Sequence, residues 1–138
     1  MQKTRMKKAV IFDMYSVLVR LNLLINEAED TQMTQIVREL KEKGVMRILL
    51  SNIYVWNSTH FKNKFPFLSL FDRLYFSSDI KLAKPDPRAF KLVLEENNLK
   101  PEEVIYFDNS KRNVATAQAL GIESYLFEGP EQVREKLL

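Results

Sequence analysis

The chain has 138 residues, of which 46% are hydrophobic and 28% charged, and its net charge is +3. This length suits one domain with a packed core, and the composition excludes a disordered or fibrous protein. The absence of cysteine and the single histidine exclude disulfides, thiolate metal sites and histidine-based zinc sites or catalytic triads. Any chemistry must therefore come from carboxylates, hydroxyls and lysines.

The distribution of charge and hydropathy also limits the expected partners. Part of the basic charge lies in residues 1–7, which we expect to form a solvated N-terminal tail on a single domain covering residues 1–138. Lysines and arginines do not gather with aromatic residues along one face, so no nucleic-acid partner is expected. No signal peptide opens the chain, and no apolar run approaches the roughly 20 residues of a membrane span. We therefore expect a cytoplasmic protein without a membrane partner.

Short apolar runs alternate with longer amphipathic runs along the chain, which is typical of an α/β fold. Nearly continuous apolar residues predict strands, buried on both faces, at 8–13, 45–51, 73–77, 103–107 and 123–127. Apolar spacing and boundary residues predict helices at 30–44, 86–98, 110–121 and 130–138, with a short one before Pro66. The fold expected is a three-layer, doubly wound, Rossmann-like sheet of about five parallel strands.

Polar residues follow three of the predicted strands. The run "VIFD" ends on Asp13, "RILLSN" ends on Ser51 and Asn52, and "VIYF" is followed by Asp108 and Asn109. Ligands bind at the carboxyl ends of strands in such sheets, so these side chains are expected to share one edge. Each of them alone could be a turn or cap residue, but their common edge favours a functional site.

A lysine pair lies in "KLAKPDPRAF", where Lys84 precedes Pro85 and is therefore expected to be extended. A solvated surface position is the simple alternative for Lys84. With this segment included, the polar residues follow the order acid, hydroxyl, lysine, acid along the chain.

This order resembles the four motifs of the haloacid dehalogenase-like superfamily, carried here by "VIFDMYSVLV", "RILLSN", "KLAKPDPRAF" and "VIYFDNSKRNVATAQALGI". The resemblance spans residues 7 to about 127, and "SSD" followed by "KPDP" is similar to the branch of small-molecule phosphatases and 2-haloacid dehalogenases. It implies a Mg²⁺-dependent phosphatase with Asp13 as the nucleophile that forms a phosphoaspartate. Ser51 and Lys84 would complete the catalytic set.

The implied Mg²⁺ site consists of Asp13, the backbone carbonyl of Tyr15, Asp108 and Asn109, because Mg²⁺ prefers oxygen ligands. Tyr15 and Asn52 are the expected substrate-binding residues. Two of these positions depart from the family pattern. Tyr15 replaces the usual second aspartate, and a phenol is a poor general base at neutral pH, so turnover is expected to be slow. Asn109 replaces a frequent acid, which weakens the expected metal affinity.

These departures leave two alternatives to a phosphatase. A catalytically weakened domain of the same fold could act as a binding or regulatory partner. Tyrosine at the place of Tyr15 also occurs in metal-independent 2-haloacid dehalogenases, although the acid Asp108 counts against that activity.

The spacing of the motifs leaves no room for a cap domain, since 38 positions separate Asp13 from Ser51 and 33 separate Ser51 from Lys84. The partner is expected to be a phosphorylated substrate, small or macromolecular, and an open site implies cover from a bulky substrate or a neighbouring subunit. We hypothesise that Leu21, Leu23 and Leu24 contact either a second copy, in a homo-oligomer, or another partner. Trp56 is expected to be a packing residue.

Overall fold

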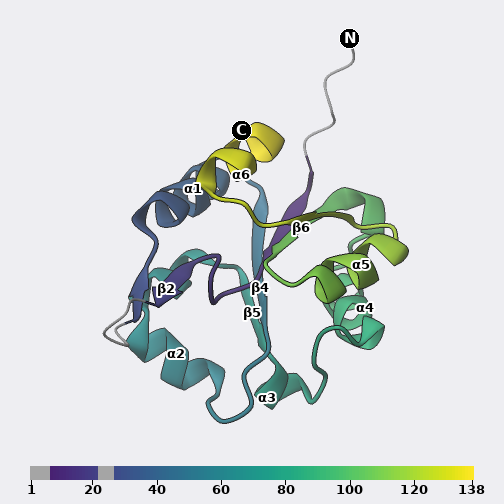
Figure 1. The fold of residues 1–138 in the computed structure, drawn as a ribbon, viewed down its shortest axis with the longest axis horizontal. Helices are drawn as coiled ribbons and strands as arrows, with labels where there is room; N and C mark the ends of the chain where they lie inside the picture. The colour runs from purple at the N-terminus through teal and green to yellow at the C-terminus, as the bar shows by residue number, and fades with distance from the viewer. Residues whose placement is uncertain (1–6, 22–26) are drawn as a thin grey trace.

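The computed structural model describes residues 7–21 and 27–138, and it contains a five-stranded parallel sheet between two layers of helices (Figure 1). The predicted fold class is confirmed, and all five predicted strands are present. The strands lie in the order β5–β4–β1–β6–β7. Their bounds are Ala9–Phe12 for β1, Met46–Ser51 for β4, Arg73–Phe76 for β5, Val104–Asp108 for β6 and Glu123–Leu126 for β7.

Helices cover both faces of the sheet, and Figure 1 shows α1, α2 and α6 on one side with α4 and α5 on the other. Their bounds are Thr31–Glu42 for α1, Ser58–Lys64 for α2, Pro87–Glu96 for α4, Lys111–Ala119 for α5 and Pro130–Leu137 for α6. Side chains at the predicted boundaries cap three of them, since Asp30, Asp86 and Ser110 accept backbone N–H groups of the first turn. The sequence did not predict the one-turn helix α3 (Ser77–Ile80) or the 3₁₀ turns Pro66–Leu70 and Pro101–Glu103.

The alternating side chains of β1 contribute to two separate cores. Ala9 and Ile11 pack under α4 and α5, whereas Val10 and Phe12 pack with α1 and α6 on the other face. The ring of Phe12 stacks on that of Phe107, with 5.9 Å between ring centroids. The central strand is therefore held on both faces up to the residue before Asp13.

Between β1 and α1 the chain forms a small antiparallel hairpin of β2 (Val19–Leu21) and β3 (Glu27–Glu29), which the sequence analysis did not predict. Strands of three residues are too short to show an alternating pattern. The proposed contacts of Leu23 and Leu24 fall outside the described residues, as does the side chain of Leu21. From β4 to Lys84 the chain forms only α2, a 3₁₀ turn, β5 and α3, so the described residues contain no separate cap domain.

The described chain is attached to the domain from its first residue. Lys7, which the prediction placed in the tail, donates from Nζ to the carbonyl of Glu102 at 3.0 Å and lies 3.3 Å from a Glu123 carboxylate oxygen. Lys7 is thus in contact with the folded domain. Within residues 7–21 and 27–138, no helix has the length and apolar character needed to cross a membrane.

Candidate active site

The direction of the chain across the sheet reverses at β1, which lies between β4 and β6. Crevices for ligands in open parallel sheets form at this kind of position, beyond the carboxyl ends of the strands. Asp13 follows β1 directly and its backbone N–H donates to the carbonyl of Phe107 at 3.1 Å, while Asp108 ends β6. The two predicted carboxylates therefore come from neighbouring strand ends.

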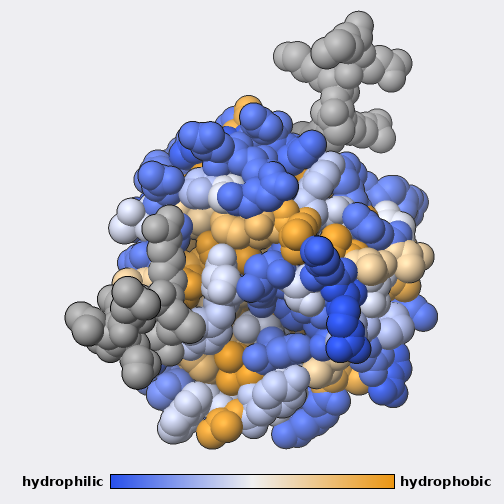
Figure 2. Space-filling model, viewed as in Figure 1, coloured by the Kyte–Doolittle hydropathy of each residue, from blue (hydrophilic) through white to orange (hydrophobic). Residues whose placement is uncertain are grey.

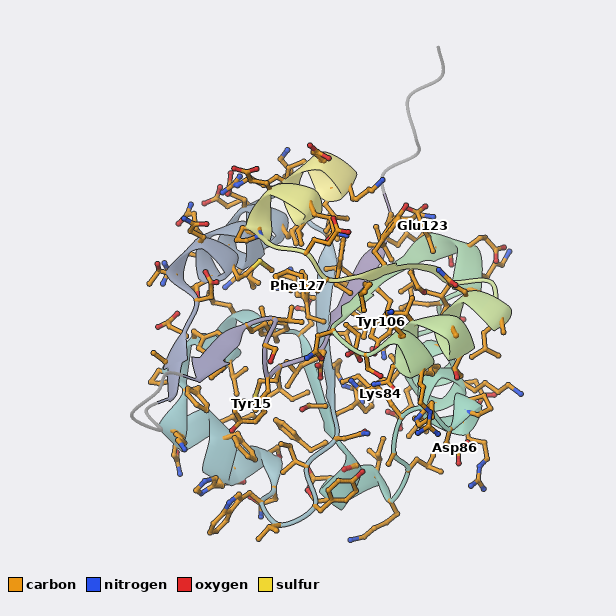
Figure 3. The ribbon with its side chains drawn as sticks, in the orientation of Figure 1. Tyr15, Lys84, Asp86, Tyr106, Glu123 and Phe127 are labelled. Atoms are coloured by element: carbon orange, nitrogen blue, oxygen red, sulfur yellow. The ribbon has the colours of Figure 1, made fainter. Side chains whose placement is uncertain are left out.

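The ammonium group of Lys84 joins these two carboxylates. Its Nζ lies 3.0 Å from Asp13 Oδ1 and 2.9 Å from Asp108 Oδ2, and it also donates to the carbonyl of Leu50 at 2.7 Å. The side chain of Lys84 is only 1% exposed. The solvated alternative for this lysine is therefore wrong, and Figure 3 shows it beside Tyr106, near the centre of the molecule.

Asn52 positions Lys84 through the backbone. Its Nδ2 donates to the carbonyl of Lys84 at 2.8 Å, and its Oδ1 accepts the N–H of Lys84 at 2.9 Å. Both ends of the amide are thus engaged by one peptide segment. The amide of Asn52 therefore orients the backbone of Lys84, and its predicted contact with substrate stays a prediction.

Asp108 lies in a dense set of hydrogen-bond donors. Its Oδ2 accepts from Lys84, from the hydroxyl of Tyr106 and from Nδ2 of Asn113 at 3.0 Å, and its Oδ1 accepts the N–H of Ser110 at 2.9 Å. Burial raises the pKa of Asp108, but the charge of Lys84 and these hydrogen bonds outweigh it and lower the pKa below its ordinary value. Asp108 is accordingly an anion at neutral pH.

Tyr106 is a site residue that the sequence analysis missed. It lies two residues before Asp108 on β6, so both side chains point to the same face of the sheet. Burial, together with the neighbouring Asp108 charge, raises the pKa of Tyr106 far above its ordinary value, so its hydroxyl remains a proton donor. In the sequence this residue cannot be distinguished from an ordinary aromatic residue of a buried strand.

The pKa of the other carboxylate, Asp13, is shifted in the opposite direction. Burial raises the pKa of Asp13 to about 6, the positive charge of Lys84 opposes this increase, and the charge of Asp108 adds to it. The two carboxylates share a single ammonium group, so the cluster of Asp13, Asp108 and Lys84 carries one net negative charge when all three are ionised.

The remaining predicted residues lie around this cluster. Ser51 ends β4 and is 2% exposed. Among the described residues, every polar side-chain atom that is fully enclosed has a hydrogen-bond partner. The hydroxyl of Ser51 has no such partner among the described residues, so it must have some contact with solvent. Tyr15 is half-buried and packs against the core, and Figure 3 shows it near α2, away from Lys84. The amide of Asn109 faces both carboxylates, and its Nδ2, when turned inward, lies 3.1 Å from Asp108 Oδ1 and 3.2 Å from Asp13 Oδ2.

These groups fit the chemistry of a Mg²⁺ site with few protein ligands. Mg²⁺ binds oxygen, retains several waters and commonly uses one or two carboxylates, and the cluster offers two carboxylates with uncompensated negative charge. The amide of Asn109 can also present its oxygen to the same point between Asp13 and Asp108. Within the described ranges, no group of three or more histidine, aspartate or glutamate residues is arranged to hold a metal.

Comparison with known proteins identifies the family. Residues 6–127 match the model of the haloacid dehalogenase-like hydrolases, and the chain belongs to this family, as its four motifs indicated. The phosphorylated carbohydrates phosphatase of Thermotoga maritima is 45% identical over 53 residues, which are 38% of this chain and 24% of that protein. Another curated relative is aligned over 10% of its length, so the chain spans only a tenth to a quarter of these relatives.

Solved structures share the fold over nearly the whole chain. A haloacid dehalogenase superfamily hydrolase from Ehrlichia chaffeensis superposes with a TM-score of 0.80 over 98% of each chain, at 17% identity. A family enzyme of Bacteroides thetaiotaomicron, solved with magnesium and inorganic phosphate, has a TM-score of 0.71 over 86% of this chain and 93% of that chain, at 22% identity. At these identities the likeness establishes the fold alone.

The hydroxyl of Tyr106 is expected to stabilise the folded protein through Asp108. Tyr106→Phe keeps the ring but leaves the buried carboxylate with one donor fewer, and hydrogen bonds to charged groups contribute about 1.5–3 kcal/mol. We expect the free energy of unfolding to fall by about that amount in urea titrations. Tyr75→Phe is the matched control, since its hydroxyl bonds Glu96, which is partly exposed, and it should lose less. Equal losses would contradict the assigned role.

The two carboxylates are expected to affect stability with opposite signs. The pKa of Asp13 is raised from 3.8 to about 6 on folding, so its contribution to the stability of the folded protein is lost as the pH rises through about 6. In a metal chelator, Asp13→Asn should therefore raise the thermal unfolding midpoint at pH 8, by roughly 2–6 °C, and the gain should vanish below pH 4. Asp108→Asn should lower the midpoint at pH 8, because the pKa of Asp108 is depressed. A lower midpoint for Asp13→Asn at pH 8 would refute the assignment.

Proposed function

We propose that the chain is a Mg²⁺-dependent phosphatase that acts through a phosphoaspartate on Asp13. The observation that carries the proposal is the contact of one buried ammonium group, on Lys84, with the carboxylates of Asp13 and Asp108 at 3.0 and 2.9 Å. This arrangement combines a nucleophile, a cationic group beside it and a second acid suited to a metal. The phosphatase named among the relatives and the neighbouring fold solved with magnesium and phosphate support the same reaction class.

In the first step, a carboxylate oxygen of Asp13 attacks the phosphorus of a phosphate monoester. The bond from phosphorus to the alcohol oxygen breaks, and the departing oxygen takes a proton from water. In the second step, water attacks the phosphorus and releases a proton to solvent, which replaces the one taken in the first step; the bond to Asp13 breaks, and inorganic phosphate leaves. Splitting the displacement into two steps lowers the barrier of each. The exposed part of the Ser51 hydroxyl and the ammonium of Lys84 would donate to phosphoryl oxygens, where charge increases in the transition state.

The Mg²⁺ ion would be held by Asp13, Asp108, the backbone carbonyl of Tyr15 and Asn109, together with waters. When bound, it would neutralise charge on the phosphoryl oxygens. Tyr106 and Asn113 fix the orientation of Asp108 by donating to its Oδ2, which leaves Oδ1 turned toward Asn109. Asn52 holds Lys84 in the same way, through its backbone.

The position of Tyr15 favours slow turnover. The side chain packs half-buried against the core, and the family's second aspartate, which would serve as general acid and base, is absent. General acid–base assistance is typically worth about 10²- to 10⁴-fold in rate. The same observation supports the second candidate, a domain of this fold that retains phosphate or metal binding and serves as a regulatory partner. The buried, ionised Asp108 argues against a metal-independent dehalogenase.

Asp13→Asn should abolish the hydrolysis of an aryl phosphate in the presence of Mg²⁺, with a loss of at least about 10³-fold, because an amide cannot act as the nucleophile. Initial rates of phosphate release measure this effect. Glu128→Gln removes an exposed carboxylate and should leave the rate unchanged. Equal rates for the protein and Asp13→Asn would exclude the enzyme, and release of halide from a 2-haloacid without metal would identify a dehalogenase.

Asn109→Asp should increase the affinity for Mg²⁺ by about tenfold, since it places a third carboxylate beside Asp13 and Asp108. Calorimetric titration with Mg²⁺ measures the dissociation constant directly. Asn98→Asp makes the same charge change at an exposed turn and should have no effect. An unchanged affinity in Asn109→Asp would show that Asn109 does not face the ion.

A further inference from the structure

The loop that follows β4 exposes three consecutive large apolar residues. Tyr54 is 74% exposed, Val55 79% and Trp56 52%, and in the described part of the chain the other exposed large hydrophobic residue is Leu138, at 39%. The sequence analysis expected Trp56 to be a packing residue, and its exposure corrects that expectation. We call Tyr54, Val55 and Trp56 the apolar rim.

The apolar rim is held in place by α3 and α2. Ser77 Oγ accepts the N–H of Ile53 at 2.8 Å and donates to its carbonyl at 2.7 Å, and Ser78 Oγ donates to the carbonyl of Trp56. The ring of Trp56 stacks on His60, with 4.1 Å between ring centroids and 14° between planes. Both the backbone and the aromatic ring are therefore positioned in advance, which lowers the entropy cost of binding a ligand.

The apolar rim begins two residues after Asn52, whose amide holds Lys84. An extended chain spans at most about 3.6 Å per residue, so the Cα of Tyr54 lies within about 7 Å of the Cα of Asn52, and that of Trp56 within about 14 Å. The loop lies beyond the end of β4, next to α3, at the lower edge of the view in Figure 1. On the same face, Figure 2 shows hydrophilic residues in the middle, with hydrophobic residues above and below them.

The size of the apolar rim favours a small ligand over a second copy of the chain as its occupant. Given 150–250 Å² for an aromatic side chain, the exposed part of these three residues is on the order of 400 Å². A stable protein interface needs about 800 Å² from each partner, so the apolar rim alone is too small for a dimer. It matches one aromatic ring or a short apolar chain, and the part of the chain that the structure describes has no cap domain to supply such contacts.

We infer that the apolar rim binds the alcohol portion of the substrate while the phosphoryl group lies at Asp13 and Lys84. The substrate class is then a phosphate monoester of an aromatic or extended apolar alcohol, in preference to a sugar phosphate. The inference rests on the proposed function, because the phosphoryl position defines where the alcohol portion begins. Apolar contact with a positioned loop gives specificity in the absence of a cap.

The test compares two unreactive phosphonates, methylphosphonate and benzylphosphonate, by calorimetric titration with Mg²⁺ present. We expect benzylphosphonate to bind about tenfold more tightly, since one aromatic contact typically strengthens binding by about that factor. It should also change the fluorescence of Trp56, which is the single tryptophan of the chain. Tyr54→Ala and Trp56→Ala should remove the preference for the benzyl group without weakening methylphosphonate. Leu138→Ala, at the exposed apolar residue outside the apolar rim, should keep the preference.

The outcomes separate this inference from the proposed function. Equal affinities for the two phosphonates in the unmodified protein would overturn the apolar rim as a substrate contact and leave the phosphate site intact. Failure of both phosphonates to bind would overturn the phosphatase and this inference together. A dimer in sedimentation that becomes a monomer in Tyr54→Ala or Trp56→Ala would assign the apolar rim to a second copy and refute the inference.

Discussion

The contact of one buried ammonium group with two carboxylates is the constraint on which the rest of the site depends. Lys84 has almost no access to water, and its charge is compensated by Asp13 and Asp108 within 3.0 Å. An unpaired charge in this position would cost several kcal/mol, so the ends of β1 and β6 and the segment that carries Lys84 must meet accurately for the fold to be stable. The contact that stabilises the fold is therefore the same contact that places a cation beside the two carboxylates.

The two carboxylates differ because their hydrogen-bond environments differ. Asp108 receives donors from Lys84, Tyr106, Asn113 and Ser110, which hold its pKa low, whereas burial raises that of Asp13. Asp108 is therefore charged at neutral pH and held in one orientation, whereas the charge of Asp13 is less well compensated. Under the proposed function this arrangement would suit Asp13 as the nucleophile, since a carboxylate with few hydrogen bonds keeps its electron pairs available, and a cation nearby favours its ionised form.

The architecture around this cluster leaves the site open. In the described residues, the segments between β1 and α1 and between β4 and Lys84 form a hairpin, β5 and short helices, so under the proposed function the substrate contacts come from the loops at the sheet edge. The loop after β4 is rigidly attached to α3 and carries exposed aromatic residues, whereas Tyr15, the residue that departs most from the family pattern, packs against the core.

The sequence by itself determined the five strands, the main helices and the acid, hydroxyl, lysine, acid order, because apolar periodicity, caps and motif spacing are local or ordered along the chain. Only the tertiary structure decided how these groups are used, since Tyr106, Asn113 and the two-sided bond of Asn52 to Lys84 depend on contacts between distant segments. The hairpin at β2 and β3 was missed because its strands are too short to carry a periodic signal. The exposure of Trp56 depends on which neighbours fold over it, and an aromatic residue in a sequence does not specify that.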